Sequence, residues 1–368
     1  MKVIISKENL LEGINIVQKA VSTKSTMQIL EGILIKATNN FKMTGNDTEM
    51  GIECTLEADI RREGSIVINS KMLGDIVRKL PESEVLIEVK DNEKVIIECE
   101  NSHFEIKGIP SDGYPELQLI ENGNMFVTTQ NIVRDMIRQT IFAVGFDDNR
   151  PVLKGILIES NGKELDFVAI DGFRMAQRRK ISTEEFSLIK VIVPGKTMNE
   201  IVKILQPEDE EVKIISSKNH VLFDINNVKI LSRIIEGEYL DYKSIIPSDY
   251  DTEVLVDKKE FLGSLERASL ISSEEKKYPL KFDIDDEKII LSSSTELGTV
   301  REEIRVDMKG RKMEIGFNPR YFIEALKAIE EERVKVVFTS EIGPSTIFPL
   351  DGNEFAYMIL PVRMNKDV

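Results

Sequence analysis

The chain has 368 residues, 41% of them hydrophobic, and its 49 basic and 64 acidic residues give a formal net charge of −15. This length exceeds what one hydrophobic core usually organises, so two or three domains are expected. The acidic balance argues against an ordinary nucleic-acid-binding protein, unless the positive charge is confined to an inner face. No apolar run is long enough for a signal peptide or a membrane span, so we expect a cytoplasmic protein that does not bind membranes.

The residues that most often carry metal or redox chemistry are scarce and isolated. Cys54 and Cys99 show no metal-ligand spacing and are expected to be reduced core residues. His103 and His220 stand alone in strand-like segments, where structural roles are expected. We therefore expect no metal, no cofactor and no histidine-based catalytic triad.

The first predicted helix lies within residues 6–22 and returns twice, within 128–144 and 257–273. In each copy apolar residues recur at helical spacing. The corresponding apolar positions, spaced 122 and 129 residues apart, are Leu10, Ile132 and Phe261. Short differences in loop length explain the unequal spacing.

Each first helix is followed by an alternating apolar pattern that predicts a pair of strands. Turn-forming residues separate the strands, and we expect hairpin turns at 39–40, 161–162 and 285–286. More strands follow the second helix of each copy, and the predicted closing segments are 108–120, 236–247 and 351–362.

The clearest internal repeat is residues 69–89, which predict an amphipathic helix, a turn and a strand. Pro81 cannot continue the helix, and the alternation after it is typical of a half-buried strand. The apolar stripe of the helix consists of Met72, Leu73, Ile76, Val77 and Leu80. The pattern returns from Pro194 and from Asn318. Its anchor positions, 125 and 124 residues apart, are Leu73, Met198 and Phe322.

The polar face of this second helix repeats as well. Basic residues stand two positions before and five positions after each anchor, and they are Lys71, Arg78, Lys196, Lys203, Arg320 and Lys327. The members of each pair are seven residues apart and share one helical face. Between them stand Asp75, Glu200 and Glu324. One interpretation is a solvated face with intrahelical ion pairs. The other is an anion-binding face, because each copy keeps a net positive charge on an acidic chain.

The repeats predict three α+β domains, covering residues 1–124, 125–249 and 250–368. Each domain is expected to contain two helices on largely antiparallel sheets, with about eight short strands. If neighbouring domains dock through their sheet edges, the array has two edges left at its ends. A head-to-tail contact between two chains could then close a ring.

Five segments in order carry a family resemblance: RPVLKGILIE (150–159), AIDGFRMA (169–176), EGEYLDYKSIIP (236–247), FNPRYFIEAL (317–326) and ILPVRM (359–364). Together with the triple repeat, they resemble the bacterial DNA polymerase III β subunit family, the sliding clamps, over Met1 to Met364. The resemblance implies a processivity factor of DNA replication without catalytic activity. It also implies a head-to-tail homodimer of six similar domains, with helices lining a hole and sheets outside.

By this resemblance, the six repeated cations face double-stranded DNA. Such contacts reach phosphates and read no sequence. Lys24 lies in a loop where the family carries a basic DNA contact, and a solvated loop lysine is the alternative. The implied protein partners are the replicative polymerase α subunit, the clamp loader and other proteins with a clamp-binding motif.

These partners would bind through a hydrophobic pocket for a short extended peptide, and apolar side chains around one arginine suit that role. By resemblance the pocket consists of Leu153, Ile170, Gly172, Phe173, Arg174, Met175, Leu240, Ile245, Tyr321, Met358, Ile359, Leu360, Pro361, Val362, Arg363 and Met364. This chain departs from the family pattern at Ile170, Leu240 and Ser244, where threonine, proline and arginine are common. These departures affect the expected shape of the pocket.

The subunit contact is expected at Phe104, Leu270 and Ile271, which match hydrophobic interface positions of the family. Burial in the core of their own domains is the alternative.

Two other functions remain open at this point. A Mg²⁺-dependent nuclease or phosphotransferase is suggested only by the acidic clusters at 46–49 and 283–286, which coincide with expected turns. No phosphate-binding glycine loop accompanies them. An acidic scaffold that binds only proteins would not require the repeated basic positions.

Overall fold

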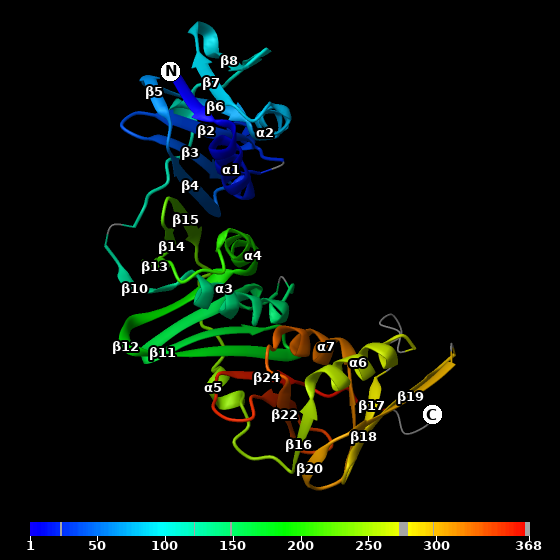
Figure 1. Ribbon diagram of the computed structural model, residues 1–368. Coiled ribbons are helices and arrows are strands. Elements are labelled where there is room, and N and C mark those ends of the chain that lie inside the picture. Colours follow the sequence, from blue (N-terminus) through cyan, green and yellow to red (C-terminus); the bar gives the residue numbers. More distant parts are fainter. Residues whose placement is uncertain (23, 121, 148, 272–278, 297, 365–368) are drawn as a thin grey trace. The chain divides into compact units, whose positions relative to one another are not determined.

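The computed structural model describes the chain except residues 23, 121, 148, 272–278, 297 and 365–368 (Figure 1). The chain forms two compact units. Unit 1 contains Met1–Asn131 and Glu200–Ile234, and unit 2 contains Ile132–Asn199 and Ile235–Val368. The middle of the chain therefore contributes to both units.

Unit 1 consists of two antiparallel sheets and the helices α1 (Lys7–Val17) and α2 (Ser70–Lys79). The five-stranded sheet has the order β5-β1-β7-β8-β9, and the eight-stranded sheet has the order β10-β13-β14-β15-β4-β3-β2-β6. Their strands are β1 (Lys2–Ser6), β2 (Gly32–Ala37), β3 (Phe41–Asn46), β4 (Met50–Leu56), β5 (Asp59–Arg62), β6 (Gly64–Asn69), β7 (Glu84–Val89), β8 (Lys94–Cys99), β9 (Ser102–Lys107), β10 (Asn124–Thr129), β13 (Glu211–Ser216), β14 (His220–Ile225) and β15 (Val228–Arg233).

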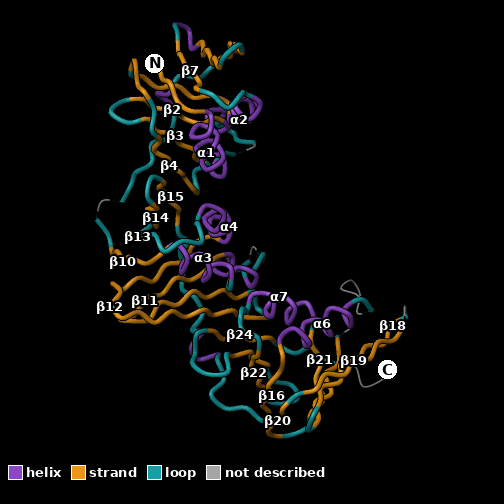
Figure 2. The backbone as a smooth tube through the Cα atoms, viewed as in Figure 1, coloured by secondary structure: helices purple, strands orange, loops and turns teal. Residues whose placement is uncertain are grey.

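Unit 2 has a seven-stranded sheet, β11-β12-β24-β23-β22-β16-β20, and a four-stranded sheet, β19-β18-β17-β21. Their strands are β11 (Gly155–Ile170), β12 (Arg174–Pro194), β16 (Thr252–Asp257), β17 (Leu280–Asp285), β18 (Lys288–Thr295), β19 (Gly298–Arg305), β20 (Asp307–Gly310), β21 (Met313–Phe317), β22 (Arg333–Phe338), β23 (Ser345–Phe348) and β24 (Phe355–Ile359). Its helices are α5 (Tyr242–Ile245), α6 (Lys258–Ser269), α7 (Pro319–Ala328) and most of α3 (Gln130–Arg138). Helices α6 and α7 lie side by side (Figure 2). Helix α4 (Gly195–Ile204) begins in unit 2 and ends in unit 1.

Two strand pairs join consecutive repeats within single sheets. In unit 1, β15 pairs with β4, and Ile230 lies opposite Ile52. In unit 2, β12 pairs with β24, and Ala176 lies opposite Tyr357. Consecutive repeats therefore dock through sheet edges, which is the condition on which the ring hypothesis depends. Strands β9 and β19 each stand at the end of a sheet.

Two of the second helices begin with an asparagine cap, and all three bury their predicted anchors. The Asn69 side chain accepts a hydrogen bond from the Met72 amide at 3.0 Å, and Asn318 caps α7 in the same way. Such a cap contributes about 1 kcal/mol to stability. The anchor side chains Leu73, Met198 and Phe322 are completely buried. Met72, by contrast, is exposed and does not belong to the apolar stripe, because α2 buries the face defined by Leu73, Gly74 and Val77.

The predicted hairpin turn at 161–162 is wrong. Strand β11 runs through both residues, and β12 pairs with it on either side of them. Gly162 has a φ of +61° and coincides with shifts in the β11–β12 register, so it forms an irregularity within a long strand. The turns at 39–40 and 285–286 do connect hairpins, β2–β3 and β17–β18.

Two of the three predicted closing segments also differ from the structure. Residues 351–362 supply β24, but 236–247 contain the short helix α5, and 108–120 contain a 3₁₀ turn and a single bridge from Ile109 to Val67. Among the described residues, the first and third repeats contribute nine strands each, β1–β9 and β16–β24. The middle repeat contributes six, β10–β15, because two of its strands are long and continuous.

Candidate functional site

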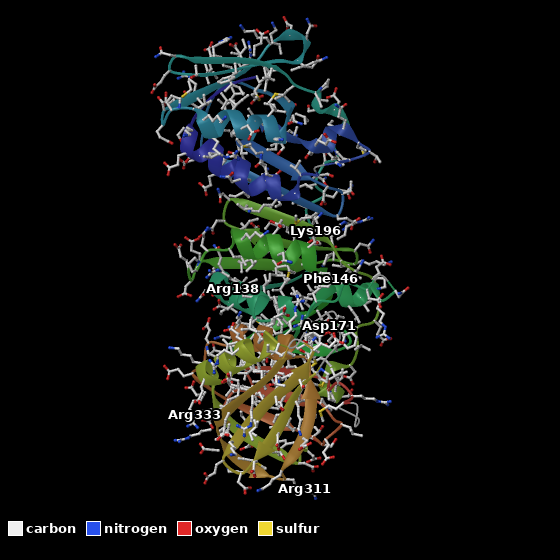
Figure 3. All side chains as sticks on the ribbon, turned by 90° about the vertical axis from the view of Figure 1, so that its right-hand side faces the viewer. Arg138, Phe146, Asp171, Lys196, Arg311 and Arg333 are labelled. Atoms are coloured by element: carbon white, nitrogen blue, oxygen red, sulfur yellow. The ribbon has the colours of Figure 1, made fainter. Side chains whose placement is uncertain are left out.

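The seven predicted DNA-binding cations are exposed in both units. Lys24, Lys71, Arg78 and Lys203 belong to unit 1, and Lys196, Arg320 and Lys327 belong to unit 2. Figure 3 labels Lys196 on the helical side of unit 2, together with Arg138 of α3. In each second helix the cations and the buried anchor occupy different faces, because cations and anchors are separated by two or five residues.

Ion pairs within these helices are present, as the solvated-face interpretation predicts. Arg78 bonds to Asp75 at 3.1 Å, and Lys203 bonds to Glu200 at 2.7 Å. Such exposed pairs contribute only about 0.5 kcal/mol each. They hold the side chains on the surface without preventing them from exchanging a carboxylate for a phosphate.

The turn between β11 and β12 is built by Asp171. Its Oδ1 accepts hydrogen bonds from the amides of Phe173 at 2.9 Å and Arg174 at 3.0 Å. Gly172 has a φ of +93°, a conformation that favours glycine. The turn leaves the Phe173 side chain 61% exposed, while the Phe173 carbonyl accepts a hydrogen bond from the Leu360 amide at 2.9 Å. The turn and the C-terminal segment are thus tied together.

Arg174 is a buried cation at the base of this turn, with only 7% of its surface exposed. Its guanidinium donates to Asp171 Oδ2 at 2.9 Å, to Glu324 and to the carbonyl of Phe142. It also lies 4.6 Å from the centroid of the Tyr321 ring, which stacks on Phe173. Two carboxylates and an aromatic face compensate the cost of burying this charge.

The pocket residues other than Arg174 and Met364 divide into a buried floor and an exposed or half-buried rim. The floor consists of Leu153, Ile170, Met175 and Met358, which form one core cluster with Tyr239 and Tyr242, and Ile245 packs against it. Ile359 is buried as well. The exposed members are Gly172, Phe173, Leu240, Leu360, Val362 and Arg363, while Tyr321 and Pro361 are half-buried.

Met364, the last of the predicted pocket residues, lies against strand β21. The Val362 amide donates to the carbonyl of Gly316 on β21 at 2.8 Å. A Cβ atom at Gly316 would lie 2.7 Å from Met364 Cγ, so the glycine permits the close approach of this methionine. Met364 therefore packs on the four-stranded sheet.

Met175 is 1% exposed, so it supports the rim from below and offers no surface to a ligand. We expect Met175→Ala to lower the free energy of unfolding by about 2 to 5 kcal/mol, because the truncation leaves a cavity in the core. Denaturant unfolding would measure this change. Met364→Ala is the control, because its half-exposed side chain should cost much less. Equal stability of wild type and Met175→Ala would contradict the assignment of Met175 to the floor.

A buried polar network beneath the rim was not predicted from the sequence. The Tyr242 hydroxyl lies 2.7 Å from Glu159 Oε2 and 3.0 Å from Asp166 Oδ2, and Arg179 donates two hydrogen bonds to Asp166. Burial raises the pKa of Tyr242 and keeps its hydroxyl protonated. The network fixes the segment that carries Leu240. A tyrosine two residues after Leu240 was the only sequence signal for it.

A hollow of about 400 Å³ lies beside this segment. It is lined by Glu159, Lys190, Glu238, Tyr239, Leu240, Asp241, Tyr242 and Lys243. Only Leu240 belongs to the predicted peptide pocket. The charged lining distinguishes this hollow from an apolar site.

Comparison with known proteins identifies the family. Sequence profiles of the DNA polymerase III beta subunit match the chain in order: the N-terminal domain at residues 1–118, the central domain at 128–241 and the C-terminal domain at 243–363. The chain belongs to the DNA polymerase III beta subunit family. The predicted family and the predicted α+β fold of three clamp domains are thus confirmed.

Individual members of the beta subunit family resemble the chain over its whole length. The beta sliding clamp of Bacillus subtilis is 36% identical over 376 residues, covering 99% of this chain and 100% of the relative. That of Halalkalibacterium halodurans is 34% identical over 378 residues with the same coverage. The crystal structure of a beta subunit from Eubacterium rectale has a TM-score of 0.96 at 39% identity, covering 99% of this chain and 100% of that chain. The Bacillus subtilis sliding clamp structure has a TM-score of 0.96 at 35% identity, with the same coverage.

The residues expected at the contact between the two protomers are accessible to solvent in the single chain. Phe104 is exposed on β9, the end strand of the five-stranded sheet. Leu270, just after α6, is 80% exposed, and Ile271 is half-buried. Core burial is therefore the wrong interpretation for Phe104 and Leu270.

The acidic clusters and cysteines have local structural roles. Asp47 Oδ1 accepts from the amides of Glu49 and Met50 in a turn, and Asp285 pairs with Lys312. Cys54 and Cys99 are buried free thiols, and burial raises the pKa of Cys54 to about 12. Over the described part of the chain, no group of three or more His, Cys, Asp or Glu residues is arranged to hold a metal ion. None of the described helices is long and apolar enough to cross a membrane.

Proposed function

We propose that the protein is a DNA sliding clamp, which encircles duplex DNA and tethers the replicative polymerase to it. One observation carries this proposal. The three second helices of an acidic chain expose cations at equivalent positions, from Lys71 to Lys327, while their anchors are buried. Membership of the DNA polymerase III beta subunit family supports the same function.

The cations would face DNA phosphates, with Lys24 as a further contact. Long, exposed side chains in weak ion pairs can exchange one phosphate for the next without a deep energy minimum, so the ring can slide. Retention on DNA is then topological. Neither a catalytic residue nor a cofactor is needed for this task, and we propose that the chain has no catalytic activity of its own.

The protein partners would bind at the rim around Phe173, Leu240, Leu360 and Val362. These exposed apolar side chains stand on a buried floor, and the aromatic pair Phe173–Tyr321 is fixed by Arg174. A short extended peptide with apolar anchors fits such a surface. The proposed partners are the polymerase α subunit, the clamp loader and other proteins with the clamp-binding motif, all in the cytoplasm.

The ring would be a head-to-tail homodimer of domains 1–124, 125–249 and 250–368. Strand β9 of one protomer would meet β19 of its partner, because both are end strands next to exposed apolar positions. Arg267 bonds to Glu302 at 2.5 Å and thereby links α6 to β19. This pair holds Leu270 close to the proposed edge.

Reversing the charge of Lys71, Lys196 and Arg320 to Glu tests the DNA-binding face. We expect loading onto circular duplex DNA of any sequence to fall at least about tenfold. The slope of log affinity against log salt should decrease by about one for each phosphate that the variant no longer neutralises. Filter binding at several salt concentrations, together with a loading assay, measures both effects.

The control replaces Lys36, Lys180 and Lys309 with Glu, because these exposed lysines lie on strands and give the same change in net charge. Equal loss of loading in both triple variants would assign the effect to overall charge. Undiminished loading of the helix variant would contradict the assignment of Lys71, Lys196 and Arg320 to the DNA-binding face.

A further inference from the structure

The acidic residue of the third repeat is bonded differently from its counterparts. Asp75 and Glu200 each pair with a cation three residues later on their own helix. Glu324 instead accepts at Oε1 from Arg320 Nε, four residues earlier, at 2.7 Å. Lys327, three residues after Glu324, pairs with Glu266 on α6 at 2.8 Å. The ion pairs of Glu324 therefore differ from those of Asp75 and Glu200 on the other two helices.

The second oxygen of Glu324 bonds to the buried arginine of the peptide site. Arg174 Nη1 donates to Glu324 Oε2, although the two residues are 150 positions apart. Position 50, which is 124 residues before Arg174, is Met50, so the first repeat has no equivalent cation. The Glu324 carboxylate thus bridges one exposed arginine and one buried arginine.

Arg174 connects this bridge to the exposed aromatic rim. Its guanidinium lies 4.6 Å from the centroid of the Tyr321 ring, and that ring stacks on Phe173 with centroids 6.4 Å apart. Asp171 holds the same guanidinium at 2.9 Å and builds the turn that carries Phe173. Any change in the hydrogen bonds that position the Arg174 guanidinium therefore affects the stacked side chains of Tyr321 and Phe173 directly.

The carboxylate of Glu324 is shared between two charge-assisted hydrogen bonds. Partial burial opposes its ionisation, yet the hydrogen bonds from Arg320 and Arg174 hold the pKa of Glu324 below its usual value. Sharing weakens each bond, because one negative charge serves two cations. If a phosphate binds Arg320 in place of Glu324, the full negative charge of the Glu324 carboxylate is available to Arg174. The hydrogen bond between Glu324 and Arg174 then becomes stronger.

We propose that Glu324 is a positioning residue for the peptide pocket and that it transmits phosphate binding at Arg320 to Arg174, so that DNA strengthens peptide binding. This inference rests on the proposed function, because it requires Arg320 to contact DNA and Phe173 to contact a peptide. The two sites need no further element between them, since the carboxylate contacts both arginines.

Isothermal titration of the full chain tests this coupling. The probe is a short extended peptide with a glutamine near its start and a leucine and phenylalanine at its end, with and without saturating duplex DNA. In the wild type we expect DNA to tighten peptide binding about fivefold, at the low end of typical coupling. Arg320→Ala should bind the peptide about fivefold more tightly without DNA, and DNA should add nothing. Glu324→Gln should bind it more weakly and show no response to DNA.

Lys327→Ala is the matched control. It removes a cation from the same helix and the same proposed DNA face, but its partner is Glu266. It should weaken DNA binding and keep the fivefold response at saturating DNA. Melting temperatures show whether each variant is folded. If Glu324→Gln does not fold, the result for Arg320→Ala decides the test.

The outcomes separate the two proposals. A wild type that binds both ligands without any change in peptide affinity would overturn the coupling and leave the sliding clamp intact. Retention of the full response in Arg320→Ala would also overturn it. Failure of the wild type to bind duplex DNA or the peptide would refute the proposed function, and the coupling with it.

Discussion

Leu270→Lys combined with Ile271→Lys is expected to produce a folded monomer. In the proposed ring these side chains are buried against the partner, and a buried lysine without a carboxylate costs several kcal/mol. The dimer dissociation constant should rise at least about a hundredfold. Sedimentation velocity at low micromolar concentration measures the mass. The substitutions should spare the fold, because Leu270 is 80% exposed in the single chain.

Ile342→Lys is the control for this experiment. Ile342 is 88% exposed between β22 and β23, and the substitution adds a charge to an exposed apolar position outside the proposed contact. This variant should remain a dimer. A dimer of unchanged stability in the Leu270/Ile271 variant would show that the interface lies elsewhere.

Leu240→Ala combined with Leu360→Ala is expected to abolish most of the affinity for a partner peptide. Both side chains are exposed at the rim, so truncation should leave the buried floor packed. Each truncation of a contact residue should cost about 1 to 2 kcal/mol. Together they should weaken binding about 30- to 900-fold if the two effects are additive.

Titration with the glutamine-containing peptide measures this loss, and the mass of the dimer should stay unchanged. Leu188→Ala provides the control, since Leu188 is an exposed apolar residue of β12 that does not belong to the rim. Unaltered peptide affinity in the folded double variant would place the peptide site elsewhere on the chain. Loss of affinity in Leu188→Ala as well would point to a nonspecific effect.

The sequence by itself determined the repeats, the helices and the exposure of the cations. These features depend on local periodicity: Leu73, Met198 and Phe322 fall on the buried face of a helix because the same apolar spacing surrounds each of them. The cations two positions before them then lie on the surface. The caps Asn69 and Asn318 act within three residues, so they too depend on the local sequence.

Only the tertiary structure decided how the strands are shared and which pocket residues are accessible. The Asn-Gly pair at 161–162 is a good local turn signal, but pairing with the long strand β12 on both sides overrides it. Met175 and Phe173 are both apolar and stand two residues apart, yet Met175 is buried and Phe173 exposed, because β24 and the Tyr239–Tyr242 segment cover only one of them.

The bridge from Arg320 through Glu324 to Arg174 likewise has one part that the sequence predicts and one part that only the tertiary structure decides. The Arg320–Glu324 pair follows from helical spacing and is visible in the sequence. The bond from Arg174 joins residues 150 positions apart, and no local pattern specifies it. It forms because the pairing of β12 with β24 and the packing of α7 bring the β11–β12 turn and the helix together, which only the folded chain can do.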